Sequence, residues 1–143
     1  MAITLYIAKK YGGALGPQSV EEDAQMMQWS FFAATEIETT GLKLSYLAAE
    51  GKLASEPGRT EAEAHGRLLK RSFAVLEKHL SAHDYMVGDR FTAADVNVAE
   101  ILRYPSGYAP LMDAHPAVSA YLARCQARPA FKTMWEARLA EPA

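Results

Sequence analysis

Apolar residues recur three or four positions apart along almost the whole chain, which is the spacing of one face of an α-helix. Two such stripes lie in residues 26–33 and 118–125, and a final amphipathic segment follows Arg128-Pro129. A further stripe consists of Leu68, Leu69, Phe73, Leu76 and Leu80. No segment alternates at period two for long enough to predict a strand. We therefore predict an all-α fold, built as a helical bundle.

Helix boundaries are indicated by breakers and caps. Gly12-Gly13 should end a short first helix, because glycine readily ends helices. Ser19 and Glu22 have the spacing of a capping box and should begin a long helix, which Gly41 is expected to kink. Thr60 and Glu63 have the same spacing, and this second box predicts a helix that extends to about His79.

Composition excludes several classes of function. The 143 residues carry a net charge of −2, so the chain has no basic field to hold nucleic acid or an anionic membrane. Its apolar stretches are too short for a membrane span, and its start lacks the pattern of a signal peptide. The one cysteine, Cys125, has no partner for an internal disulfide. We expect a cytoplasmic protein that binds neither nucleic acid nor a membrane.

A third set of cap residues lies in the segment Phe91–Val96. Thr92 is placed to accept a hydrogen bond from the N–H of Asp95, and the Asp95 carboxylate to accept one from the N–H of Thr92. Phe91 and Val96 are spaced to close over that box as a hydrophobic staple. We expect these four residues to be a structural cap.

This segment, with 87–90 before it, resembles the G-x-x-[FL]-[ST]-x-A-D motif of glutathione transferases, which begins a central helix of their C-terminal domain. Three other segments resemble the family in the same order: 3–12 the last helix of its thioredoxin-like N-terminal domain, 28–36 the first helix of its all-helical domain, and 116–130 a late helix. The resemblance covers essentially the whole chain. It implies that residues 1–13 are the remnant of the thioredoxin-like domain and that residues 14–143 are the C-terminal helical domain.

The resemblance also implies where the chemistry lies. In this family the group that activates the glutathione thiol belongs to the N-terminal domain, which precedes the region matched here. The resemblance therefore assigns no catalytic residue and no cofactor to this chain. Glutathione would be a co-substrate of the full enzyme, and the chain alone is expected to be inactive.

In the family, the first long helix and the central helix line a pocket for a hydrophobic electrophile. The corresponding positions here are Phe31, Phe32, Thr35, Glu36, Glu38, Arg103, Tyr104 and Tyr108. Bacterial members often carry histidine at the position of Glu38. Apolar stripes at helical spacing mainly fill cores, so Phe31 and Phe32 have core packing as their alternative.

Metal chemistry is not indicated. The four histidines are His65, His79, His83 and His115. They lack the carboxylates or cysteines that would complete a zinc site, so we predict no metal and expect solvated or packed side chains. Cys125 lies on a predicted inner face, where buried thiols are usually inert.

Two functions stay open at this point. The chain is either the electrophile-binding and dimerisation half of a glutathione-conjugating enzyme, or a non-catalytic module for dimerisation or scaffolding. Helical domains of this kind also occur in elongation factor gamma subunits and in aminoacyl-tRNA synthetase complexes. The helix faces that would pack on an N-terminal domain should expose apolar surface, so we expect a homodimer.

Overall fold

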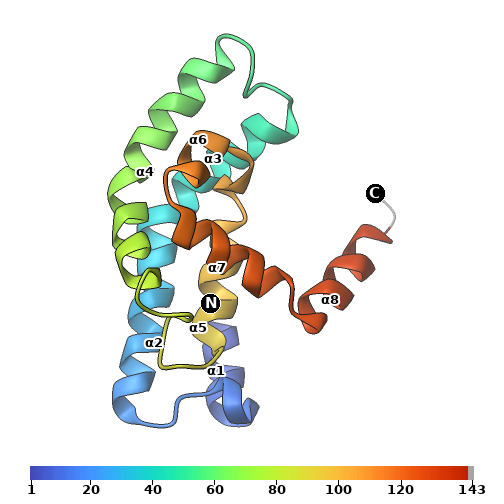
Figure 1. Ribbon diagram of the computed structural model, residues 1–143. Helices are drawn as coiled ribbons and strands as arrows, with labels where there is room; N and C mark the ends of the chain where they lie inside the picture. Colours follow the sequence, from blue (N-terminus) through green and yellow to red (C-terminus); the bar gives the residue numbers. More distant parts are fainter. Residues whose placement is uncertain (142–143) are drawn as a thin grey trace.

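The computed structural model describes residues 1–141, which form helices and connecting turns without a strand (Figure 1). The predicted all-α fold is confirmed. The α-helices are α1 (Ala2–Tyr11), α2 (Val20–Ala33), α3 (Thr39–Ala49), α4 (Gly58–Leu80), α5 (Ala93–Leu102), α6 (Ala109–Asp113), α7 (Pro116–Gln126) and α8 (Pro129–Leu139). Short 3₁₀ turns occupy Gly13–Leu15 and Pro105–Gly107, and a π-helical turn, η2 (Ala34–Glu38), joins α2 to α3. None of the helices in residues 1–141 is both long and apolar enough to cross a membrane.

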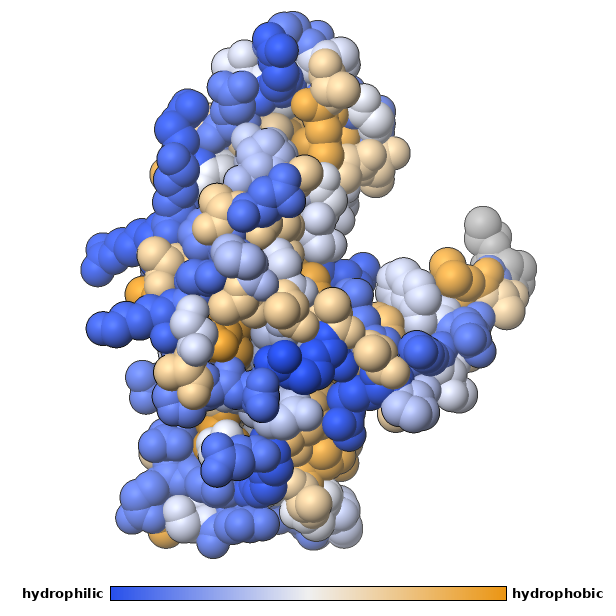
Figure 2. Space-filling model, viewed as in Figure 1, coloured by the Kyte–Doolittle hydropathy of each residue, from blue (hydrophilic) through white to orange (hydrophobic). Residues whose placement is uncertain are grey.

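Helices α2 and α3 form one long rod with η2 between them, and α4 runs back beside it (Figure 1). Helix α5 lies against α2, and α7 packs on both α4 and α5. Helix α1 packs on α5, whereas α8 projects away from the body. Figure 2 shows hydrophobic surface (orange) beside hydrophilic surface on that projecting helix. The core therefore lies among α2, α4, α5 and α7.

The inward face of α4 confirms most of its predicted stripe. Leu69, Phe73, Leu76 and Leu80 are buried. Leu68, however, is 69% exposed, so its prediction as a core residue is wrong. Leu68 and Leu69 are neighbours in sequence and point about 100° apart around the helix, which places Leu68 outside the face that packs on the core.

Two of the predicted helix starts differ in outcome. Ser19 is the N-cap of α2, and its hydroxyl accepts a hydrogen bond from Glu22 N at 3.2 Å. The box predicted at Thr60 and Glu63 is wrong, because α4 begins two residues earlier, at Gly58. Pro57 already has helical backbone angles and its carbonyl accepts from Glu61 N, while the Thr60 hydroxyl donates to Glu56.

The kink predicted at Gly41 is also wrong, because the irregular turn lies before it, at η2. Gly41 has a different role. A Cβ atom at this position would lie 3.0 Å from Pro105 Cδ and 3.4 Å from Tyr104 Cβ. The missing side chain thus lets α3 pack directly on the 3₁₀ turn that follows α5, which brings the face of the rod next to Tyr104.

The start of α5 is held by one buried carboxylate, that of Asp95. It accepts hydrogen bonds from the backbone N–H groups of Thr92 and Met86, both at 2.8 Å, and from the Tyr121 hydroxyl at 3.0 Å. Thr92 and Asp95 form the capping box. Phe91 lies against Tyr85 and under the Arg128 guanidinium, and Val96 is 40% exposed. Asp95 therefore joins the loop before α5, the helix itself and α7.

Candidate functional site

Most of the predicted substrate-binding residues belong to the C-terminal part of α2, to η2 and to the end of α5, and α5 contacts both of the other elements. Phe31 is 60% exposed on α2, and its carbonyl accepts a hydrogen bond from the Thr35 hydroxyl at 2.9 Å. Glu38 follows at the end of η2, close enough to Tyr104 for its charge to act on that phenol. We call the surface formed by Phe31, Thr35, Glu38, Arg103 and Tyr104 the η2/α5 surface.

Arg103 is the most constrained side chain on the η2/α5 surface. Its guanidinium donates two hydrogen bonds to Glu100, from Nε at 3.1 Å and from Nη2 at 2.6 Å. It also lies 5.4 Å from the centre of the Tyr104 ring and 4.9 Å from that of Trp135, within cation–π range of both. The hydrogen bond to Glu100 raises the pKa of Arg103. The cation is therefore held in place by α5 and α8 together.

Tyr104 favours its neutral form. Burial is the main cause of its raised pKa, and the nearby carboxylates Glu100 and Glu38 raise it further. The phenol can therefore act as a hydrogen-bond donor at neutral pH and does not supply a phenolate. The η2/α5 surface thus offers exposed aromatic area, a fixed cation and a neutral hydroxyl donor, which suits binding of a polarised aromatic molecule.

Two of the predicted residues lie elsewhere. Phe32 is half-buried against the core, with its ring edge-to-face with Trp29 at 5.7 Å. Tyr108 lines a different cavity, between α4 and α6. Tyr108 thus lies apart from the other candidates, among which Phe31 pairs with Thr35 and Arg103 with Tyr104.

Two of the histidines, His79 and His83, and the buried cysteine are held in packing contacts. His79 stacks between Trp29, at 4.6 Å, and His83, at 4.5 Å, and burial lowers its pKa. Within residues 1–141, no three His, Cys, Asp or Glu side chains are grouped closely enough to hold a metal ion. Burial raises the pKa of the Cys125 thiol to about 12, so it is protonated at neutral pH. Cys125 is therefore not an activated nucleophile.

Sequence reasoning missed Trp135 as a neighbour of Arg103, and it missed the cavity between α4 and α6. The contact with Trp135 depends on the angle at which α8 leaves α7, which no local pattern encodes. Gly66 was an available signal for the cavity, since a glycine inside a long helix costs about 1 kcal/mol and often marks close packing.

Comparison with known proteins decides the family. The family model described as "Glutathione S-transferase, C-terminal domain" matches residues 23–129. The chain belongs to this family. Glutathione S-transferase 3 of Zea mays is 32% identical over 138 residues, which cover 92% of this chain and 62% of that protein. This glutathione S-transferase C-terminal domain thus spans less than two thirds of the length of that relative.

Two further matches show which other proteins this glutathione S-transferase C-terminal domain is similar to. A probable elongation factor 1-gamma 2 of Arabidopsis thaliana is 31% identical over 92% of this chain and 32% of its own length. The structure of Ure2p5 from Phanerochaete chrysosporium, cocrystallised with 1-(S-glutathionyl)-2,4-dinitrobenzene, has a TM-score of 0.73 and is 26% identical. That match covers 99% of this chain and 70% of the other. The family therefore includes both transferases and an elongation-factor relative.

Proposed function

We propose that this domain is the electrophile-binding half of an enzyme that conjugates glutathione to hydrophobic electrophiles. The observation that carries the proposal is the η2/α5 surface, where Phe31 exposes an aromatic ring and Arg103 holds a fixed charge near Tyr104. A dinitrophenyl group, as in the ligand of the Ure2p5 structure, is flat, electron-poor and polar at its nitro groups. Such a group would stack on Phe31 and accept hydrogen bonds from Arg103 and Tyr104.

The role of this half would be to hold the electrophile in place. Positioning two reactants beside each other lowers the barrier of their reaction without any nucleophile from this chain. Glutathione would be the co-substrate, bound and activated by a thioredoxin-like domain. We propose that residues 1–13, which contain α1, are the last helix of that domain. The outward side chains Ile3, Tyr6 and Ile7 are 75%, 58% and 50% exposed, which would suit packing against it.

A chimaera tests this proposal. The part of the Zea mays transferase that precedes the matched region would be joined to this chain, and conjugation of glutathione to 1-chloro-2,4-dinitrobenzene would be measured. We expect turnover by the chimaera and none by the 143-residue chain alone. Phe31→Ala should raise KM for the electrophile about five-fold, since a stacking contact contributes about 1 kcal/mol, with KM for glutathione unchanged.

Leu68→Ala is the matched control for Phe31→Ala, because Leu68 is 69% exposed on α4 and lies outside the η2/α5 surface. Equal effects of the two substitutions on KM would contradict the assignment of the surface. A folded chimaera without turnover, or turnover by the isolated chain, would contradict the division of labour between the two halves.

The elongation factor relative supports a second function, that of a non-catalytic module for dimerisation or scaffolding. For either function we propose a homodimer, formed through exposed apolar side chains, and a cytoplasmic location suited to the single reduced thiol Cys125. Sedimentation analysis over a hundredfold range of concentration distinguishes the assembly states. A strictly monomeric chain throughout this range would contradict the dimer.

A further inference from the structure

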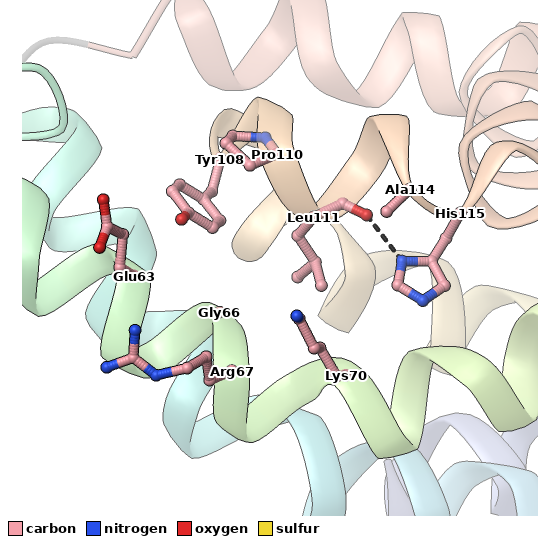
Figure 3. Close-up of a pocket in the computed structure, with 9 residues that line it drawn as sticks. All are labelled: Glu63, Gly66, Arg67, Lys70, Tyr108, Pro110, Leu111, Ala114 and His115. Atoms are coloured by element: carbon pink, nitrogen blue, oxygen red, sulfur yellow. Dashed lines mark hydrogen bonds between the residues drawn. The ribbon is translucent and has the colours of Figure 1, made fainter.

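A cavity of about 340 Å³ lies between α4 and α6, away from the η2/α5 surface (Figure 3). Its volume is within the range of small-molecule sites. Glu63, Gly66, Arg67 and Lys70 line it from α4, at the spacing that places four residues on one face of a helix. Leu111 and His115 lie on the opposite wall.

The apolar side of the cavity depends on Gly66. A Cβ atom at Gly66 would lie 2.5 Å from Cε1 of Tyr108, so the tyrosine ring packs directly on the helix backbone. Figure 3 shows this ring in the gap between α4 and α6, with Leu111 beside it. Tyr108 and Leu111 therefore supply the apolar part of the lining, against which an aromatic ring could pack.

The polar side of the cavity has an excess of positive charge. Lys70 and Arg67 form no ion pair or hydrogen bond with any side chain of the described residues. In Figure 3 the Lys70 ammonium points toward Leu111, into the space between the two helices. Glu63 is the one acidic side chain among the lining residues.

His115 adds a polar atom at the far end of the cavity. Its Nδ1 is 2.7 Å from the Leu111 carbonyl oxygen, so that nitrogen carries a proton and donates it. Its ring lies edge-to-face with Phe73 at 5.3 Å, which fixes its orientation. Within the described part of the chain, Nε2 has no hydrogen-bond partner. The ring is held by the protein and keeps one nitrogen for a ligand or water.

We propose that this cavity binds a small aromatic carboxylate. The ring of the ligand lies against Tyr108 and Leu111, and its carboxylate faces Lys70, with Arg67 adding to the attraction. A neutral aromatic molecule lacks the second interaction, and an aromatic amine is repelled by both cations. This binding site is independent of glutathione conjugation and shares no residue with the η2/α5 surface.

Fluorine NMR of the 143-residue protein tests the proposal, with 4-fluorobenzoate as the probe and 4-fluorobenzamide as its neutral counterpart. We expect the benzoate to bind at least three-fold more tightly than the amide, as a partly exposed ion pair contributes up to about 1 kcal/mol. Lys70→Met should weaken benzoate binding about three-fold and leave the amide unchanged. Glu63→Gln should strengthen benzoate binding about two-fold, because it removes a like charge.

Lys78→Met is the matched control, since Lys78 is exposed on the same helix and does not line the cavity. Ala114→Leu fills the cavity from α6 and should abolish binding of both probes while the circular dichroism spectrum stays unchanged. Equal losses from Lys70→Met and Lys78→Met would overturn the site, because they would show a response to overall charge. Equal affinity for the benzoate and the amide, or full binding by Ala114→Leu, would overturn it as well.

Discussion

Helix α5 and the two terminal helices differ in how much of their apolar surface the rest of the chain covers. Seven of the ten residues of α5 are buried, among them Asp95 and Asn97. Helix α1 buries only Ala8, and α8 buries no residue, although both have apolar side chains at helical spacing. An amphipathic stripe therefore predicts a helix in all three places. It does not predict whether the surface that covers the stripe belongs to this chain.

Polar groups show the same difference. In α5, the Asn97 side chain donates to the Ser30 hydroxyl at 3.0 Å, which in turn donates to the Met26 carbonyl at 2.8 Å. Both buried polar side chains of α5, Asp95 and Asn97, thus have hydrogen-bond partners within this chain. On α1 the exposed apolar side chains lie beside Lys9 and Lys10, which are also exposed. The buried helix α5 thus specifies the fold, whereas the terminal helices α1 and α8 keep exposed apolar side chains that another chain could cover.

The largest expected effect comes from one substitution made in both regions. Ile101→Ser in α5 should lower the free energy of unfolding by about 4 kcal/mol, because Ile101 is 2% exposed and the change leaves a cavity with a polar group in it. Ile7→Ser in α1, where Ile7 is 50% exposed, should change it by less than about 0.5 kcal/mol. Urea denaturation measures both. Similar losses would show that α1 is as well packed as α5.

The next largest effect is expected for Asp95→Asn. Asparagine keeps one acceptor oxygen and turns an amide donor toward groups that are themselves donors, so the free energy of unfolding should fall by about 3 kcal/mol. Asp89→Asn, at an exposed position in the preceding loop, is the control and should cost less than about 0.5 kcal/mol. Urea denaturation of the two variants would disprove the role of Asp95 if they lost the same amount.

The stability of the protein at alkaline pH tests whether burial disfavours the charged form of the Cys125 thiol. Burial, followed by the charge of Asp95, raises the pKa of Cys125 from 9.0 to about 12. As pH rises, the thiol therefore loses its proton in the unfolded chain before it does so in the folded one. The stability that the protonated thiol contributes is fully present below pH 9 and falls as pH rises toward 12. Between pH 8 and pH 10 the free energy of unfolding should fall by about 1.4 kcal/mol more in the natural chain than in Cys125→Ala. Parallel pH profiles for the two proteins would contradict the burial of the thiol.

The smallest effect is expected for Trp135→Ala. The contact of Trp135 with Arg103 at 4.9 Å is a principal link between α8 and the body, and such a partly exposed contact contributes up to about 1 kcal/mol. The global free energy of unfolding should change by less than that, while amide exchange should speed up in residues 129–139 alone. Met134→Ala, on the exposed side of the same helix, should leave exchange unchanged. Faster exchange throughout the protein would show that α8 belongs to the core.

Helix positions followed from sequence wherever a local rule acts alone. Ser19 and Thr92 cap the helices that they were expected to cap, because a cap involves only neighbouring residues. The rule failed at Thr60, where Pro57 offered an earlier start, and at Leu68, where periodicity did not separate two adjacent leucines. The candidate surface was harder to anticipate. Glu38 lies near Tyr104 because Gly41 lets α3 approach Pro105 closely. Trp135 contacts Arg103 because of the turn between α7 and α8. Both are tertiary contacts, which no local pattern in the sequence predicts.

The π-helical turn Ala34–Glu38 has a consequence for how this helix can change in evolution. A π turn holds one residue more than an α-helical turn would, so it is equivalent to a one-residue insertion within a continuous helix. Deletion of that residue would close the segment to an ordinary α-helical turn and leave the residues after it facing the way they do now. Leu44 and Leu47 would stay on the α4 side, and Gly41 would still face Pro105. Deletion of one residue elsewhere in the rod would instead rotate everything after it by about 100°. A single-codon deletion in this segment thus changes the length of the helix without changing its register, and lineages with and without it would present the same residues to the same neighbours.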